Sequence, residues 1–308
     1  MDATFSGHHG PRLPRELECT IFEAAALSRP TSIPQLALVA WRVNHWVEPL
    51  LYQVLFVSRY SESYSSRGIH QKSGLPVSNA EILLGKIANK PAEFLRSSVK
   101  HLFLDVFKKS DVEAILMACI CVTNLFIETS STPDPRTLAG LQCLHHLTID
   151  IETLFGGPDI DFSHPLFRNI THLELLDDYR QGLRMDVLCS GLALIPHLTH
   201  IAFNTIPKRP ELGGLSVLHA RLRADIRLQC ILFLSPDVRD AMRARRVLSG
   251  DDRIVCIDQD AYRLDWIHGA RTGEDYWTLA EAFIAAKRAG KVDRMLYNIS
   301  DDDDSWRT

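Results

Sequence analysis

One short pattern recurs through the middle of the chain and constrains its fold more than any other feature. The pattern is h-x-x-h-x-h, where h is an apolar residue, and successive copies begin 22 to 30 residues apart. The six copies VKHLFL, VTNLFI, LHHLTI, ITHLEL, LTHIAF and LQCILF begin at Val99, Val122, Leu144, Ile170, Leu198 and Leu228. A weaker seventh copy, RIVCID, begins at Arg253. Alternating apolar residues predict a short strand, and their regular recurrence predicts a repeated structural unit.

Helical patterns fill the intervals between these strands. The segments SDVEAILMACI, from Ser110, and DPRTLAGLQCL, from Asp134, have apolar residues at helical spacing and begin with an N-capping residue. SPDVRDAMRARRVL, from Ser235, has a similar pattern. Each unit is therefore a strand, a turn, a helix and a turn. One such unit cannot bury its own apolar face, whereas stacked units form a continuous core.

The N-terminal part of the chain has a different pattern, which is typical of a small helical module. Leu17, Ile21 and Phe22 lie on one face of a predicted helix, and Pro30 and Pro34 break the chain after it. A second amphipathic stripe is formed by Leu36, Val39, Val43, Trp46 and Val47. A helical module of about 45 residues buries little surface by itself, so it commonly needs a partner or an adjoining domain.

The strand pattern resembles the beginning of the leucine-rich repeat signature, L-x-x-L-x-L, over residues 99–258. In that family an asparagine or cysteine stands three places after the last apolar residue. Here those places hold Phe107, Ser130, Glu152, Asp178, Ile206 and Pro236. The resemblance therefore implies an irregular strand/helix solenoid without the side-chain ladder that ties successive turns together in the family.

The N-terminal segments LPRELECTIF and LALVAWRVNHWVEPLLY resemble an F-box. The resemblance is especially to the F-box-like proteins numerous in mushroom-forming fungi, in which such segments precede loose repeats and a C-terminal Asp-Trp/Gly-Ala segment. The matching segment here is LDWIHGARTGEDYWTLAEAFIAAKRAGKV, from Leu264, so the resemblance covers nearly the whole chain. Two features depart from the family: the link ALSRPTSIPQ is longer and richer in proline, and Ala40 replaces a cysteine.

This resemblance implies a non-enzymatic adaptor that recruits a target protein to a Skp–cullin–F-box ubiquitin ligase. The module would dock onto the Skp-family adaptor, and the repeat array would bind the target. Carried over by position, the first contact patch is Leu13, Pro14, Leu17, Ile21 and Phe22, and the second is Leu36, Leu38 and Val39. The alternative is a repeat-based interaction scaffold whose N-terminal helices only cap the array and pack fully against it.

Histidines recur at one place of the strand pattern. If the second and third apolar residues of each copy face the core, the residues before them form two columns on the opposite, concave side. The first column is His101, Asn124, His146, His172 and His200, followed by Cys230. The second column begins Phe103, Phe126, Thr148 and Glu174.

Three interpretations of the histidine column stay open. The imidazoles could fill a half-exposed edge position and make turn hydrogen bonds. They could instead form, with the second column, a polar and aromatic stripe that binds the target protein. In the third interpretation, His146, His172 and His200 bind zinc or serve catalysis. The pattern offers no further ligand at a fixed spacing and no nucleophile motif, so we expect no metal, no cofactor and no catalytic residue.

The remaining sequence sets the expected domain organisation and partners. We expect a disordered segment over residues 1–11, the F-box-like module over 12–57, a serine-rich linker over 58–78, the array over 79–258, a C-terminal helical cap over 259–297 and an acidic disordered tail over 298–308. The net charge of −4 without a basic stripe argues against nucleic acid, and no apolar run is long enough to cross a membrane. Seven cysteines without a Cys-x-x-Cys pair indicate reduced thiols in a cytoplasmic or nuclear protein, and we expect no homo-oligomer.

Overall fold

The computed structural model describes residues 13–58, 77–106, 108–128, 131–177, 185–204, 212–234, 250–258, 262–300 and 306. The chain divides into two units, Met1–Gln53 and Val54–Thr308. Four expected features lie wholly or largely outside the described residues: the disordered segment 1–11, most of the serine-rich linker, the helical segment from Ser235, and the aspartates 301–304 of the tail. None of the described helices is long and apolar enough to cross a membrane.

Short helices build the first unit. They are α1 (Arg15–Ser28), η1 (Pro30–Ser32), α2 (Ile33–Ala37), α3 (Trp41–Val47) and η2 (Glu48–Tyr52). Pro30 begins η1, and Pro34 lies in the first turn of α2, where a missing backbone N–H costs no hydrogen bond. The core of the unit is formed by Ala26, Ile33, Val43 and Val47, with Phe22, Leu36 and Trp46 packed against it. Arg42 of α3 donates two hydrogen bonds, of 2.7 and 3.1 Å, to the carboxylate of Glu18 of α1.

The expected boundary of the helical module is wrong by four residues. The sequence pattern places residues 54–57 at the end of the module, but Val54–Ser58 forms strand β1 of the second unit. All five residues of β1 are buried, so the segment shows none of the alternation between apolar and polar residues that marks a half-exposed strand.

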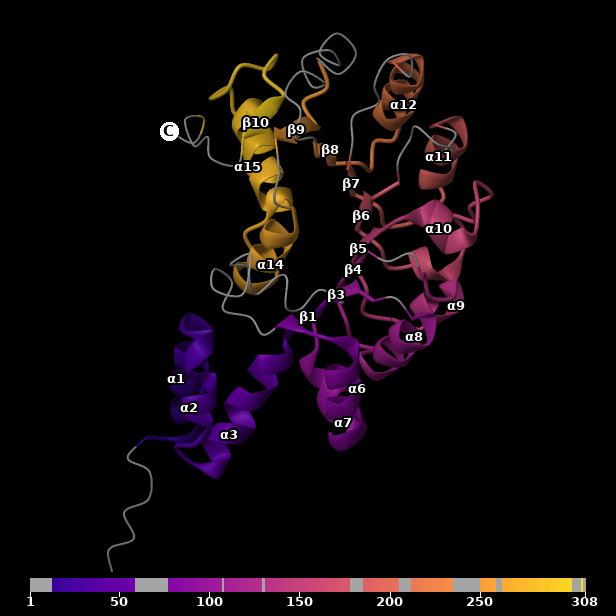
Figure 1. Cartoon of the computed structure of the whole chain (residues 1–308). Coiled ribbons are helices and arrows are strands. Elements are labelled where there is room, and N and C mark those ends of the chain that lie inside the picture. Colours follow the sequence, from indigo (N-terminus) through magenta and orange to yellow (C-terminus); the bar gives the residue numbers. More distant parts are fainter. Residues whose placement is uncertain are drawn as a thin grey trace, which may run out of the picture. The chain divides into compact units, whose positions relative to one another are not determined.

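A parallel sheet forms the centre of the second unit (Figure 1). Among the described residues its order is β10-β9-β8-β7-β6-β5-β4-β3-β1-β2, and every neighbouring pair is parallel. The six copies of the sequence pattern match six strands, of which the first and last extend one residue beyond their copies: β3 (His101–Asp105), β4 (Asn124–Ile127), β5 (His146–Ile149), β6 (His172–Leu175), β7 (His200–Phe203) and β8 (Cys230–Leu234). The weaker copy contains β9 (Ile254–Asp258). The strands predicted from the pattern, and the α/β class, are thus confirmed.

The sheet extends beyond the expected array at both edges. β1 and the two-residue strand β2 (Val77–Ser78) precede β3. At the other edge β10 (Asn298–Ser300) pairs with β9, so the expectation of a disordered tail from residue 298 is wrong for these three residues. Trp306 is also buried, with its ring edge-on to Phe283 at 5.3 Å.

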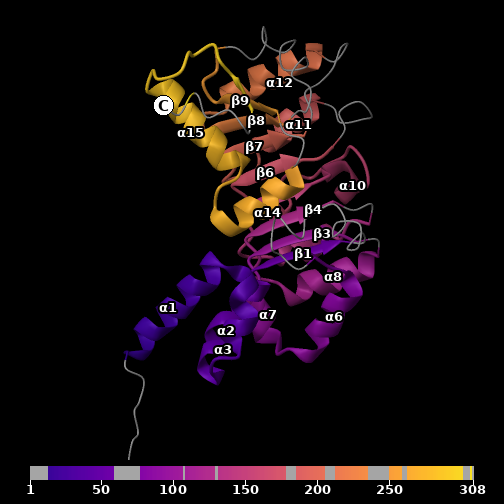
Figure 2. The same ribbon diagram turned by 60° about the vertical axis from the view of Figure 1, so that its left-hand side comes forward.

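Helices lie on both sides of the sheet (Figures 1 and 2). On one side are α6 (Ala80–Asn89), α7 (Ala92–Ser98), α8 (Lys109–Ala118), α9 (Pro135–Ala139), α10 (Ile151–Phe155), η3 (Pro165–Phe167), α11 (Met185–Leu192) and α12 (Leu212–Ala224). Lys90 and Pro91 separate α6 from α7. The side chain of Asn79 caps α6 by accepting a 2.8 Å hydrogen bond from the backbone N–H of Ile82.

The other side of the sheet carries the C-terminal helices α14 (Tyr262–Thr272) and α15 (Tyr276–Arg288). α14 contacts β1, whereas α15 contacts β8 and β9. Both helices therefore lie over the face of the sheet, and the expectation that they cap the end of the array is wrong. Phe283, Ile284 and Trp277 are buried, as the apolar stripe of this segment predicts, and Gly290 follows α15 with a φ of 73°.

Threonine hydroxyls tie successive strands together. Thr123, Thr171 and Thr199, each directly before a strand, donate hydrogen bonds of 3.0 to 3.2 Å to backbone carbonyls of Lys100, His145 and Thr171 in the preceding unit. The consensus ladder of the leucine-rich repeat would lie after the strands, at places that are mostly outside the described residues. The threonine ladder lies before them, at a place to which the sequence pattern assigns no role.

Candidate functional site

A set of apolar side chains on the first unit is exposed although the unit has its own core. The set, which we call the apolar surface, consists of Leu13, Leu17, Ile21, Leu38, Val39 and Trp41. Leu13, Leu17 and Ile21 are four residues apart, so they follow one face along the start of α1. The other three lie at the α2–α3 turn, where Leu38 is 86% and Trp41 80% exposed. An exposed apolar group of this size marks an interaction site in many proteins.

The eight residues carried over from the F-box resemblance differ in exposure. Six of them are exposed: Leu13, Pro14, Leu17, Ile21, Leu38 and Val39. Phe22 and Leu36 are only partly exposed and pack against the core of the unit. Phe22 also contacts Trp46, at a ring-centroid distance of 6.4 Å. Trp41, to which the F-box resemblance assigns no contact, stacks on His45 at 5.9 Å.

The predicted histidine column exists in the second unit, and its register is confirmed. The strand pairing aligns His101, Asn124, His146, His172, His200 and Cys230 across six strands. The rings of His146 and His172 stack at 3.9 Å, and those of His172 and His200 at 4.0 Å. The second column, which begins Phe103, Phe126, Thr148 and Glu174, is aligned by the same pairing.

The expectation that these columns face solvent is wrong for several members. Phe103, Phe126, Thr148, Glu174 and His200 are buried. The reason is the position of α14 and α15, which lie over this face. A partner protein therefore cannot reach these five side chains in the described structure, and a target-binding stripe made of both complete columns does not exist.

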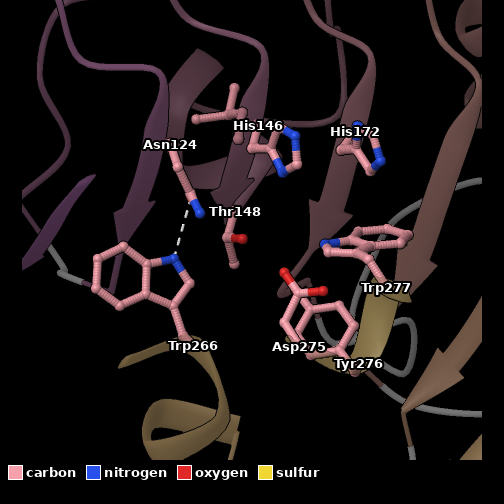
Figure 3. A pocket seen from close by; sticks show the side chains of 9 residues that line it. Asn124, His146, Thr148, His172, Trp266, Asp275, Tyr276 and Trp277 are labelled. Atoms are coloured by element: carbon pink, nitrogen blue, oxygen red, sulfur yellow. Dashed lines mark hydrogen bonds between the residues drawn. The ribbon is translucent and has the colours of Figure 1, made fainter. Parts of the chain in front are cut away.

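Helix α14 covers the aromatic part of the second column. The ring of Trp266 is edge-on to Phe103 at 5.6 Å and to Phe126 at 6.3 Å. Its Nε1–H donates a 3.1 Å hydrogen bond to Oδ1 of Asn124 (Figure 3). Tyr262 donates a 2.8 Å hydrogen bond to the carboxylate of Glu128, at the end of β4.

Helix α15 covers the polar part of the columns. The Trp277 ring stands edge-on to His172 and His200, with centroid distances of 5.2 and 5.8 Å. Glu174 accepts hydrogen bonds of 2.6 Å from the Tyr276 hydroxyl and 2.9 Å from the Thr148 hydroxyl. Asp275, before α15, caps the helix through the backbone N–H of Thr278. Figure 3 shows Asp275, Tyr276 and Trp277 opposite the strand residues.

A depression remains where the α14–α15 connection passes the histidine column. Its strand side is formed by His101, Asn124, His146 and His172. Its opposite side includes Gly273, Asp275, Thr278 and Glu281. We call this depression the imidazole groove. It leaves part of the first column open to ligands although the second column is covered.

Burial determines the charge of the column. It lowers the pKa of His101 and of His146 to about 4, and that of His172 to about 2, with smaller contributions from neighbouring positive charges. Burial also lowers the pKa of His200, and the adjacent Glu281 carboxylate opposes this shift. The imidazoles are therefore neutral near pH 7, which is the form that binds metal ions. Burial raises the pKa of Glu174 to about 7, against the two hydrogen bonds that favour its ionised form.

Glu281 is a functional candidate that the sequence pattern does not identify. It lies on α15, four residues after Trp277 and thus on the same side of the helix. Its Oε1 is 2.9 Å from Nε2 of His200. His172, His200 and Glu281 each offer a ligand atom, and these atoms lie within 4.8 Å of one another. Cys230, next in the column, is fully buried, and burial raises the pKa of its thiol, so it is a poor nucleophile.

Comparisons with known proteins add no relative to this geometry. No protein-family model matches the chain, and neither the curated proteins nor the solved structures contain a match.

Proposed function

We propose that this protein is a non-enzymatic adaptor that recruits a target protein to a Skp–cullin–F-box ubiquitin ligase. The first unit binds the Skp-family adaptor through the apolar surface. The second unit is a leucine-rich-repeat-like solenoid that binds the target.

The apolar surface is the observation that carries this proposal. Its six side chains lie at or beside the positions that the F-box resemblance assigns to adaptor contact. They are exposed although Ile33, Val43 and Val47 give the unit a core of its own. Covering a Leu or Ile side chain completely stabilises a complex by roughly 1.5–3 kcal/mol, so this surface can support association. In the alternative scaffold, these side chains would pack against the array instead of binding an adaptor.

The order of the strands supports the solenoid. From β3 to β10 each strand pairs with the next strand in the chain, and helices connect most of the pairs. Such an arrangement is typical of stacked repeats in which each unit contacts its neighbours. We assign target contact to the imidazole groove, because His101, Asn124, His146 and His172 are the column members that line it.

Co-purification with a Skp-family adaptor tests the proposal. We expect the full chain to bind the adaptor at micromolar concentration, and Leu17→Asp and Leu38→Asp to abolish binding. Ile226→Asp is the matched control, since Ile226 is a 92% exposed apolar residue of the second unit. Absence of binding by the unaltered chain would overturn the ligase function, as would equal binding by Leu38→Asp and Ile226→Asp.

A further inference from the structure

Three side chains from different elements meet beside the imidazole groove, and two of them, His172 and Glu281, also line it. His172 is on β6, His200 is its register partner on β7, and Glu281 is on α15. Their ligand atoms lie within 4.8 Å of one another. Two ligands of one tetrahedral zinc ion, each about 2.1 Å from the metal, are about 3.4 Å apart. The rings of His172 and His200 are stacked at 4.0 Å, so the two imidazoles must tilt toward each other for their lone pairs to meet at one ion.

We propose that His172, His200 and Glu281 bind one divalent transition-metal ion, and that this ion fastens α15 to strands β6 and β7. Two imidazole nitrogens and one carboxylate are a ligand set that suits Zn²⁺, with a fourth position left for water. This site differs from the set His146, His172 and His200 suggested by the sequence pattern, because a carboxylate on α15 replaces His146.

The threonine ladder can hold both imidazoles in the form that binds metal. The Thr171 hydroxyl lies 2.9 Å from Nδ1 of His172 and 3.2 Å from the carbonyl oxygen of His145. The Thr199 hydroxyl lies 2.8 Å from Nδ1 of His200 and 3.2 Å from the carbonyl oxygen of Thr171. When each hydroxyl donates its single proton to the carbonyl, its oxygen accepts a hydrogen bond from Nδ1–H. This tautomer places the lone pair of each ring on Nε2, and such support of a ligand by a second hydrogen bond is usual in metal sites.

The Glu281 carboxylate provides the negative charge of the site. Its Oε1 faces Nε2 of His200 at 2.9 Å. In the tautomer described above, a lone pair and a carboxylate would repel each other unless a cation lay between them. A proton can fill this place, and a metal ion would compete with it, because metal binding to imidazole releases any proton held there.

The surroundings allow an ion to reach the site and fix the side chains that bind it. The Glu281 side chain is 52% exposed, and both Glu281 and His172 line the imidazole groove, so the site has access to solvent. The Trp277 ring stands at 82° to that of His172 and at 88° to that of His200. Its edge-on contacts with both imidazoles limit how far these rings can rotate away from the site.

Zinc titration of the full chain tests this inference. The sequence contains the pair His8–His9, which can bind metal by itself, so every sample carries His8→Ala and His9→Ala and no affinity tag. After removal of metal by a chelator, calorimetry with Zn²⁺ alone should show one ion per chain. Glu281→Gln and His172→Gln should each weaken binding at least about tenfold, since even supporting residues of a metal site contribute that much.

Glu274→Gln is the matched control for Glu281→Gln. Glu274 is an exposed carboxylate 3.9 Å from His268, so it forms a carboxylate–imidazole pair without a second imidazole. Zinc affinity should not change in this variant. Circular dichroism of the metal-free proteins checks folding, and if His172→Gln does not fold, the exposed Glu281→Gln decides alone. Failure of the chain that carries only His8→Ala and His9→Ala to bind Zn²⁺ at micromolar concentration would overturn the inference. Equal affinities of Glu281→Gln and Glu274→Gln would overturn it too.

Discussion

The hydroxyl group of Tyr276 donates a 2.6 Å hydrogen bond to the carboxyl group of Glu174, and both side chains are buried. The two residues are 102 positions apart, on α15 and β6. Thr148 donates to the same carboxyl oxygen, so this group joins two strands and a helix at the centre of the covered face. Its other oxygen, Oε1, has no hydrogen-bond partner among the residues that the structure describes.

Tyr276→Phe should lower the free energy of unfolding by about 1–3 kcal/mol, because a buried carboxyl group then loses one of its two hydrogen-bond donors. Urea unfolding followed by circular dichroism measures this change. A double-mutant cycle with Glu174→Gln should give a coupling energy of at least about 0.5 kcal/mol. Additive effects of the two substitutions would show that the hydrogen bond does not stabilise the fold.

Trp266 should be among the residues that stabilise the second unit most strongly. Trp266→Ala removes the ring that covers Phe103 and Phe126, and we expect a loss of about 3–5 kcal/mol in unfolding free energy. Trp266→Phe keeps an aromatic ring but loses the hydrogen bond to Asn124, so it should cost less. Thermal unfolding of both variants checks this order. Equal melting temperatures for Trp266→Ala and the unaltered chain would contradict it.

The sequence predicts the strands and their register well for a physical reason. Alternation of apolar and other residues has the period of a strand, and superimposing its copies aligns His101, Asn124, His146, His172 and His200 in the column that the strand pairing confirms. The class of the fold follows from the helical segments between the strands.

The position of α15, the role of Glu281 and strand β1 could not be predicted from the sequence, because they depend on tertiary packing. The amphipathic pattern of α15 predicts that Phe283 and Ile284 are buried, but not that the helix lies over the histidine column. Glu281 therefore has no sequence signal that connects it to His200. Strand β1 escapes prediction because its residues are buried on both faces, which removes the alternating pattern.

Unfolding of the protein should become easier in mild acid, in part through His101. Burial lowers the pKa of His101 to about 4 in the folded state, whereas its ordinary value is 6.5. The folded state thus binds this proton less readily than the unfolded state. The stability that neutral His101 contributes is complete above pH 6.5 and is lost as the pH falls from 6.5 toward 4.

The substitution His101→Gln removes this titrating group. Between about pH 7.5 and pH 5 the urea midpoint of the variant should fall less than that of the unaltered chain. His145→Gln is a suitable control, because the ring of His145 is exposed. Parallel pH dependence of His101→Gln and the unaltered chain would show that the proton affinity of His101 does not differ between the two states.

In the first unit, substitutions on the apolar surface should affect binding, whereas substitutions in the core should affect stability. Leu38→Asp changes an exposed side chain and should leave stability within about 0.5 kcal/mol. Ile33→Ala removes buried atoms from the core of the unit and should cost about 2–5 kcal/mol. Hydrogen exchange of peptides from α1 and α3 measures local opening in the full chain. Faster exchange in Leu38→Asp than in Ile33→Ala would be inconsistent with the described packing.

The position of α14 and α15 has a consequence during translation. Trp266 covers aromatic residues of β3 and β4, and its hydrogen-bond partner Asn124 is made 142 residues earlier. A nascent chain must therefore hold these strands with one apolar face uncovered until α14 and α15 leave the ribosome. A chain shortened by a premature stop codon before residue 262 would keep that face exposed permanently. Such a product should bind chaperones and be degraded, so translation of α14 and α15 determines whether the earlier strands yield a stable protein.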